Sequence, residues 1–196
     1  MKVPNMAGKR AKVLSTADVG DVLVYASCTR HPLRNKVMVL LSAKAGLRAG
    51  EIANLTWPMV SDATGQISGL IELTDTAAKK CSGRSIPVHP DLAAALTAWR
   101  QVEPLSDYVI ASERGGRMRP LSVVVWFHRA FKSIGLNGCS SHSGRRTFVT
   151  RAARVVHKAG GSLRDVQLLA GHRSIQTTQR YIDGDTDAQR KLVAMI

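Results

Sequence analysis

Glycine and proline divide this chain into helix-length segments, and this division constrains the fold more than any other feature of the sequence. The first helix is expected to start after Ser15, where Asp18 three residues later completes a capping-box pattern. The next segment, Leu33–Ala45, is apolar on most faces and stops at Gly46, as expected for a buried helix. Further helices are expected at 48–55, 91–102, 122–134, 143–158, 163–169 and 174–181.

One stretch, between Gln66 and Val88, departs from the helical pattern. The segments Ile67–Thr74 and Arg84–Val88 are short and β-prone, and the polar residues between them are typical of a turn. They predict a small antiparallel sheet. The predicted fold is therefore mainly α with a small antiparallel β-sheet.

The length of the chain favours a single domain. Its 196 residues are enough for one buried core but too few for two ordinary domains and a linker. The 28 Lys and Arg residues against 14 Asp and Glu give a net charge of +14. A fold of this size does not need such an excess for solubility, so we expect a polyanion, above all nucleic acid, as the partner. A basic soluble protein without such a partner and an anionic membrane surface are the alternatives.

Several protein classes are excluded by what the sequence lacks. No apolar run approaches the roughly 18 residues of a membrane span, and no apolar segment follows the basic start as in a secretory signal. Cys28, Cys81 and Cys139 are odd in number, widely spaced and without a C-x-x-C pair, so neither a disulfide framework nor a zinc site is indicated. We therefore expect a soluble cytoplasmic protein with reduced thiols and no membrane contact.

His142 and Arg145 are a first candidate pair for chemistry. They lie three residues apart, so on a helix both side chains point the same way. A histidine can exchange a proton and a guanidinium can bind two phosphate oxygens, which suits phosphoryl chemistry. The alternative is a pair on a solvated helix surface, which this spacing alone does not exclude.

His172 and Tyr181 are a second candidate pair. They lie nine residues apart, and a continuous helix would turn through roughly 900° between them and place them on opposite faces. Gly171 can end one helix and Ser174 can cap the next, so the helix is expected to break and the two side chains to converge. The alternative is a core tyrosine and a histidine that caps a helix.

Arg48 and a lysine complete the set of candidates. Arg48 lies just beyond the break at Gly46, where it can point into a cleft and where Glu51, three residues later, can hold it. An exposed ion pair is an equally ordinary explanation of that spacing. Lys79 and Lys80 lie between the β-prone segments, and neighbours in an extended chain face opposite ways, so at most one of them can serve a given site.

Five motifs occur in order: G-L-R-x-G-E-I, a lysine eight residues before the proline of R-S-I-P-V, H-x-x-R-R-T-F, L-L-A-G-H, and a tyrosine nine residues after that histidine. Together they resemble the catalytic domain of the tyrosine recombinases, the phage integrase family. The resemblance spans about Ser15–Ile182, nearly the whole chain. Five motifs in order at compatible spacing make a coincidence implausible.

The resemblance implies a role for each matching residue. Tyr181 is implied to be the nucleophile, which attacks a DNA phosphodiester, forms a 3′-phosphotyrosyl bond and releases a 5′-hydroxyl. Arg48 and Arg145 are implied to hold the non-bridging oxygens. The other implied roles are protonation of the leaving 5′-oxygen by Lys79, handling of the tyrosine proton by His142, a hydrogen bond to the phosphate from His172, and support of the site by Glu51.

No metal or other cofactor is expected for such a reaction. Negative charge builds up on the oxygens of a phosphodiester transition state, and two fixed guanidinium groups supply the stabilisation that Mg²⁺ gives in kinases and nucleases. The covalent bond to tyrosine keeps the energy of the phosphodiester. Resealing therefore needs no ATP.

The activity implied by the resemblance is site-specific DNA recombination of the integrase or invertase type, through a Holliday junction. Two alternatives stay open: DNA relaxation as by a type IB topoisomerase, which shares the tyrosine chemistry, and a catalytically silent DNA-binding accessory protein. Double-stranded DNA is the expected partner. The basic loop residues Arg114, Arg117 and Arg119 are candidate DNA contacts, for which a solvated loop is the other explanation.

The resemblance also implies how the chain is organised. We expect a basic N-terminal segment at 1–14, the tyrosine recombinase catalytic domain at 15–182 and a C-terminal tail helix at 183–196. Only 47 residues precede Arg48, too few for the separate DNA-clamping domain of typical members, so an isolated catalytic domain or a short recombinase such as the fimbrial invertases is expected.

The tail carries a short apolar stripe. In the family such a helix docks on a neighbouring protomer, which implies a homotetramer on DNA and a monomer when free. A tail that folds back on its own domain is the alternative. The stripe consists of Ala188, Leu192 and Met195.

Overall fold

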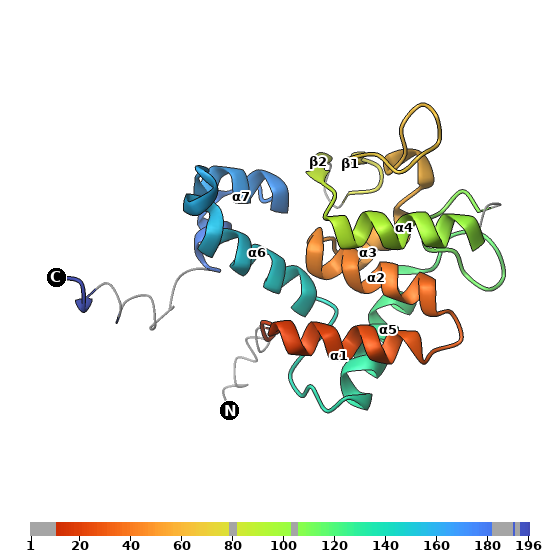
Figure 1. Cartoon of the computed structure of the whole chain (residues 1–196), viewed down its shortest axis with the longest axis horizontal. Helices are drawn as coiled ribbons and strands as arrows, with labels where there is room; N and C mark the ends of the chain where they lie inside the picture. The colour runs from red at the N-terminus through yellow and green to blue at the C-terminus, as the bar shows by residue number, and fades with distance from the viewer. Residues whose placement is uncertain (1–10, 79–81, 103–105, 182–189, 191–192) are drawn as a thin grey trace, which may run out of the picture.

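The computed structural model describes residues 11–78, 82–102, 106–181, 190 and 193–196. Its regular structure is mainly helical with one two-stranded antiparallel sheet (Figure 1), which confirms the predicted fold class. No helix in this part of the chain is both long and apolar enough to cross a lipid bilayer. The elements in chain order are α1 (Thr16–Ser27), α2 (Pro32–Lys44), α3 (Ala49–Asn54), the 3-10 helix η1 (Trp57–Met59), β1 (Leu70–Leu73), β2 (Arg84–Pro87), α4 (Pro90–Val102), α5 (Pro120–Ser133), α6 (Ser143–Val155), the 3-10 helix η2 (Val156–Ala159), α7 (Leu163–Ala170) and α8 (Ile175–Gln179).

Helix α2 forms the centre of the main hydrophobic core. It packs against α1, α4 and α6, and in Figure 1 it lies between α4 and α1. Its residues Val37–Leu41 are all buried, which explains why the segment is apolar on nearly every face. The helix ends before Gly46, whose φ of 67° favours glycine. The predicted buried helix and its glycine stop are confirmed.

Helix α1 begins as its sequence predicts. The side chain of Ser15 accepts from the backbone N–H of Asp18 at 3.0 Å, and Asp18 accepts from the backbone N–H of Ser15 at 2.7 Å. This reciprocal capping satisfies two backbone donors that a helix start leaves open. The predicted capping box is therefore confirmed.

The sheet is a hairpin of β1 and β2. Its register sets Ile71 opposite Ile86 and Leu73 opposite Arg84, and both isoleucines point into the core. The predicted antiparallel sheet is confirmed, with strands shorter than the β-prone segments. The structure also contains isolated antiparallel bridges that the sequence did not predict. One joins the distant residues Thr56 and Tyr108, and two close short loops, between Ser61 and Ile67 and between Ala111 and Arg117.

The C-terminal helices enclose a second, smaller hydrophobic cluster. The segment predicted as one helix over 143–158 is divided, because α6 ends at Val155 and η2 follows. Gly160, with a φ of 72°, ends η2, and the N–H of Gly161 donates to the carbonyl of Val156 at 2.9 Å. The buried residues of the second cluster are Val149, Ala153, Val156, Val166 and Ala170.

Candidate active site

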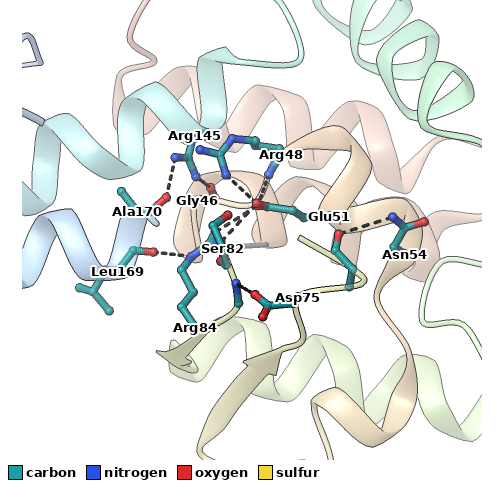
Figure 2. Close-up of polar contacts among 12 residues, drawn as sticks. Gly46, Arg48, Glu51, Asn54, Asp75, Ser82, Arg84, Arg145, Leu169 and Ala170 are labelled. Atoms are coloured by element: carbon teal, nitrogen blue, oxygen red, sulfur yellow. Dashed lines mark hydrogen bonds and ion pairs between the residues drawn. The ribbon is translucent and has the colours of Figure 1, made fainter. Parts of the chain in front are cut away.

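The fold brings Arg48 and Arg145 together from distant parts of the sequence. Arg48 is the N-cap of α3, and Arg145 lies in the first turn of α6. The buried guanidinium of Arg145 donates from Nη1 to the carbonyl of Gly46 at 2.7 Å and from Nη2 to the carbonyl of Ala170 at 2.6 Å. Gly46 lies two residues before Arg48, so this bond fixes one arginine relative to the other, and Figure 2 shows their side chains next to each other.

Glu51 holds Arg48 in place. Its carboxylate is 1% exposed, and it accepts from the backbone N–H of Arg48 at 2.9 Å and from Nη1 of Arg48 at 2.6 Å. The ion pair that the three-residue spacing predicted is present, and it is largely buried. Burial by itself raises the pKa of Glu51, but the hydrogen bonds and charges of Arg84 and Arg48 outweigh burial and lower that pKa below its usual value. Glu51 is therefore ionised at neutral pH.

Arg84 belongs to the same cluster, and the sequence prediction missed it. It opens β2, and its guanidinium donates to Glu51 Oε1 at 3.2 Å and to Oε2 at 3.0 Å, while its Nε donates to the carbonyl of Leu169 at 2.8 Å. One signal could have found it: in an extended segment Arg84 points to the same side as Ile86, which faces the core. A positive charge on an inward face requires a buried partner.

The cluster carries more positive than negative charge. Three guanidinium groups, of Arg48, Arg84 and Arg145, lie around the one carboxylate of Glu51 (Figure 2). Burial, followed by the charge of Arg48, lowers the pKa of Arg145 to about 10, so its side chain is still protonated at neutral pH. An anion placed between the arginines would relieve their repulsion. The cluster is therefore suited to bind an oxyanion such as a phosphodiester.

The predicted break between His172 and Tyr181 is present. Gly171 ends α7 with a φ of 61°, and α8 covers only Ile175–Gln179, less than the predicted 174–181. The rings of His172 and Tyr181 have centroids 5.5 Å apart and planes inclined by 23°. The guanidinium carbon of Arg146 lies 5.8 Å from the centroid of the Tyr181 ring. The predicted convergence of histidine and tyrosine is confirmed.

His172 is held in its neutral form. Burial, followed by the charges of the neighbouring arginines, lowers its pKa to about 4. Its Nδ1 lies 3.0 Å from the hydroxyl oxygen of Thr178. A neutral imidazole that is bonded through one nitrogen can donate a hydrogen bond to an anion from the other.

The remaining predicted catalytic groups are His142 and a lysine. His142 is the exposed N-cap of α6, the helix that carries Arg145, and its Nδ1 lies 3.4 Å from the hydroxyl oxygen of Ser141. Lys79 and Lys80 lie outside the described residues. The choice between the two lysines therefore stays open.

The three candidate DNA-binding arginines share one groove. Arg114, Arg117 and Arg119 are exposed and line a groove of about 830 Å³. Arg119 is the N-cap of α5, and Nη1 of Arg117 donates to the side chain of Asn54 at 2.5 Å. Asn54 ends the short helix that Arg48 caps, so the backbones of these two residues lie roughly 9 Å apart along the helix axis.

Together these residues form a site suited to attack on a phosphodiester. Guanidinium groups can bind its oxygens, a neutral imidazole can donate to one of them, and a nearby phenol is a nucleophile that can form a covalent intermediate. Among the described residues, no group of three or more His, Cys, Asp or Glu side chains is arranged to hold a metal ion.

The sequence matches the phage integrase family over residues 12–187. The tyrosine recombinase XerC of Actinobacillus pleuropneumoniae is 27% identical over 186 residues, which are 92% of this chain and 57% of the relative. The tyrosine recombinase XerA of Thermococcus kodakarensis is 28% identical over 195 residues, which are 97% of this chain and 64% of the relative. The chain thus spans less than two thirds of the length of these relatives.

Solved structures of recombinases share the fold. The crystal structure of a XerA recombinase matches 99% of this chain and 66% of its own with a TM-score of 0.74 at 22% identity. The XerH recombinase bound to a palindromic difH substrate matches 96% of this chain and 53% of its own with a TM-score of 0.74 at 18% identity. The family match covers every described candidate residue from Arg48 to Tyr181. The chain therefore belongs to the phage integrase family.

Proposed function

We propose that this chain carries the catalytic domain of a site-specific DNA recombinase, which cleaves and rejoins double-stranded DNA through a 3′-phosphotyrosyl intermediate. The observation that carries the proposal is the convergence of four segments on one site. Arg48 follows the end of α2, Arg145 lies on α6, and His172 and Tyr181 flank α8. Membership of the phage integrase family and relatives described as tyrosine recombinases support it.

In the proposed reaction Arg48 and Arg145 hold the non-bridging oxygens of the scissile phosphate. The hydroxyl oxygen of Tyr181 attacks phosphorus, so that a bond from phosphorus to the tyrosine oxygen forms and the bond to the 5′-oxygen breaks. The proton of Tyr181 passes to His142, and the departing 5′-oxygen takes a proton from Lys79. Attack by a 5′-hydroxyl reverses these steps and reseals the strand.

His172 stabilises the transition state by a hydrogen bond in this scheme. If Thr178 donates its hydroxyl proton to Nδ1, then Nε2 carries the imidazole proton and can donate to a phosphate oxygen. The low pKa of His172 keeps this arrangement unchanged near neutral pH. Its contribution would be that of one oxyanion donor, about 10²-fold in rate.

The basic groove lined by Arg114, Arg117 and Arg119 is the proposed DNA contact. Related integrases have been solved on DNA, as in the lambda integrase dimer bound to a COC′ core site and the Tn1549 transposon integrase with circular intermediate DNA. We propose that Arg114, Arg117 and Arg119 bind the DNA backbone beside the scissile phosphate, and that four copies assemble on DNA through the tail at 183–196. The chain would then be a monomer when free.

The test is a nicked duplex that traps a covalent intermediate, because the short strand beyond the cleavage point diffuses away. A set of such duplexes is drawn from the DNA that flanks the gene and incubated with the wild type and with Tyr181→Phe. The wild type is expected to form a covalent protein-DNA adduct and Tyr181→Phe to form none. Bound DNA without adduct for either protein would support a silent accessory protein, and relaxation of supercoiled plasmid at any sequence would support a topoisomerase.

A further inference from the structure

Arg84 is a buried charge with four hydrogen bonds to other residues that the structure describes. Its side chain is 6% exposed. Nη2 donates to Oε2 of Glu51 at 3.0 Å, Nη1 to Oε1 of Glu51 at 3.2 Å and to the carbonyl of Ser82 at 3.3 Å, and Nε donates to the carbonyl of Leu169 at 2.8 Å (Figure 2). Nε, Nη1 and Nη2 of Arg84 each already donate to an acceptor of the protein. In the proposed scheme Arg84 therefore acts through the groups that it holds.

The first of these groups is the carboxylate of Glu51. Glu51 also binds Arg48, and by themselves these two side chains form a neutral pair. Arg84 adds a second positive charge to the same carboxylate, so the three side chains together carry one net positive charge. Because of this surplus, the negative charge of Glu51 does not cancel the positive charge of Arg48, which can still attract a phosphate oxygen.

The second group is the end of α7, immediately before His172. Arg84 binds the carbonyl of Leu169, and Arg145 binds the next carbonyl, that of Ala170. Two positive charges at the C-terminus of a helix are favourable for its dipole and satisfy carbonyls that the helix leaves open. A Cβ on Gly171 would lie 2.9 Å from Nη1 of Arg84, so the glycine turn and the arginine fit each other.

We propose that Arg84 is a positioning residue for DNA strand cleavage, which ties the β-hairpin to Glu51 and to the last turn of α7 and thereby sets both Arg48 and His172. This inference rests on the proposed function. Arg84 does not touch the reacting atoms in this scheme. It fixes two of the groups that do, and it preserves the positive charge that they present to the phosphate.

The test measures single-turnover adduct formation on a nicked duplex by the full chain, and DNA affinity separately in a Tyr181→Phe background. Arg84→Met keeps most of the side-chain volume but removes the charge and the donors. Cleavage should slow on the order of 10²-fold, as expected when catalytic groups are displaced, whereas DNA affinity should fall by far less, because only one positive charge of the basic protein is lost. Arg84→Lys keeps the charge but cannot span carboxylate and carbonyl together, so its rate should be intermediate.

A second substitution separates positioning from a merely structural role. Arg84→Met leaves the Arg48–Glu51 pair neutral, and adding Glu51→Gln restores one net positive charge. The double variant should therefore cleave faster than Arg84→Met alone, which is opposite to additive damage. The matched control is Arg154→Met at an exposed position of α6, which should cleave like the wild type.

The outcomes distinguish this inference from the proposed function. If the wild type forms no adduct, the proposed function fails. If the wild type cleaves and Arg84→Met cleaves at the same rate, or if the double variant is slower than Arg84→Met, only the role of Arg84 is overturned. Circular dichroism checks that each variant is folded at the assay temperature. If Arg84→Met is unfolded, the test rests on Arg84→Lys, and cleavage by Arg84→Lys at the wild-type rate overturns the inference.

Discussion

The fold lowers the pKa values of Glu51 and His172, as it does that of Arg145. Burial acts on Glu51 and His172 in opposite directions, since it disfavours the charged form of either group. For Glu51 the arginines outweigh burial, whereas for His172 the arginines and burial act together. At neutral pH the site therefore holds an ionised carboxylate and a neutral imidazole.

His172 should make the folded protein less stable as the pH falls. Its pKa is about 4 in the folded chain against 6.5 ordinarily, so between these values the unfolded chain binds a proton that the folded chain does not. The stability linked to His172 is complete above pH 6.5 and is lost as the pH falls to about 4. After solvent screening of this half-buried ring, the loss should be on the order of 1–2 kcal/mol.

Urea unfolding of the wild type and of His172→Asn across this pH range checks that expectation. The free energy of unfolding of His172→Asn should depend less on pH than that of the wild type. His157→Asn, at an exposed position of η2, is the control and should follow the wild type. Equal pH dependence of the wild type and His172→Asn would contradict the proposed environment of His172.

Spacing in the sequence predicted those contacts of the site that are local. Arg48 and Glu51 lie three residues apart on one helix turn, and His172 and Tyr181 lie on either side of one short helix after the break at Gly171, so local geometry brings each pair together. Arg84 contacts Glu51 and Leu169, which are 33 and 85 positions away. No local rule connects such residues, because only the folded core determines that they meet.

At the scale of elements, α6 depends on a close approach to α2. Gly144, beside Arg145, lies so near that a Cβ there would be 3.1 Å from the backbone carbonyl carbon of Ser42. Gly20 on α1 is also helical, but a Cβ there would meet nothing within 4 Å. The two glycines therefore serve different purposes, although the sequence does not distinguish them.

Alanine substitutions at these glycines should have opposite effects. Gly20→Ala should raise the free energy of unfolding by about 0.5–1 kcal/mol, because alanine favours a helix over glycine. Gly144→Ala should lower it by about 1–3 kcal/mol through overpacking between α6 and α2. Urea unfolding midpoints measure both changes, and a stabilised Gly144→Ala would disprove the close contact between the two helices.

The centres of the helices were predictable, and several of their ends were not. The segment that is apolar on most faces and stops at Gly46 identified α2, and the Ser15 capping box identified the start of α1. The division between α6 and η2 follows instead from the second hydrophobic cluster, in which Val156 is buried. That cluster forms only when α7 packs against α6 and η2, so its effect on a helix end could not be derived from helix propensity.

At the scale of the whole molecule, the net charge of +14 favours a polyanionic partner. Three exposed arginines line a groove, and one of them, Arg117, donates to Asn54 at the end of the helix that Arg48 caps. Lys and Arg contacts to DNA phosphates release counterions, so affinity falls steeply as salt rises. Electrostatic binding of this kind holds the DNA without reading its sequence.

Salt dependence tests whether the groove binds DNA. In a Tyr181→Phe background, a plot of log affinity against log salt should lose about one unit of slope for Arg117→Ala and for Arg119→Ala. Arg154→Ala, which lies outside the groove, should keep the slope of the parent. Fluorescence anisotropy of a labelled duplex gives the affinity at salt concentrations between about 50 and 200 mM, and hence the slope. Unchanged slopes for both groove variants would assign the DNA to another surface.

The central claim is that one phenol reaches a phosphorus atom held by two distant arginines, and mass spectrometry of the trapped adduct tests it most directly. The chain has three tyrosines, so digestion of the adduct with trypsin and nuclease can identify the modified residue. A nucleotide joined through its 3′-phosphate to Tyr181, and absent when Arg145 is replaced by alanine, is the predicted result. A nucleotide on Tyr25 or Tyr108, or a Tyr181 adduct that forms equally well without Arg145, would contradict the account.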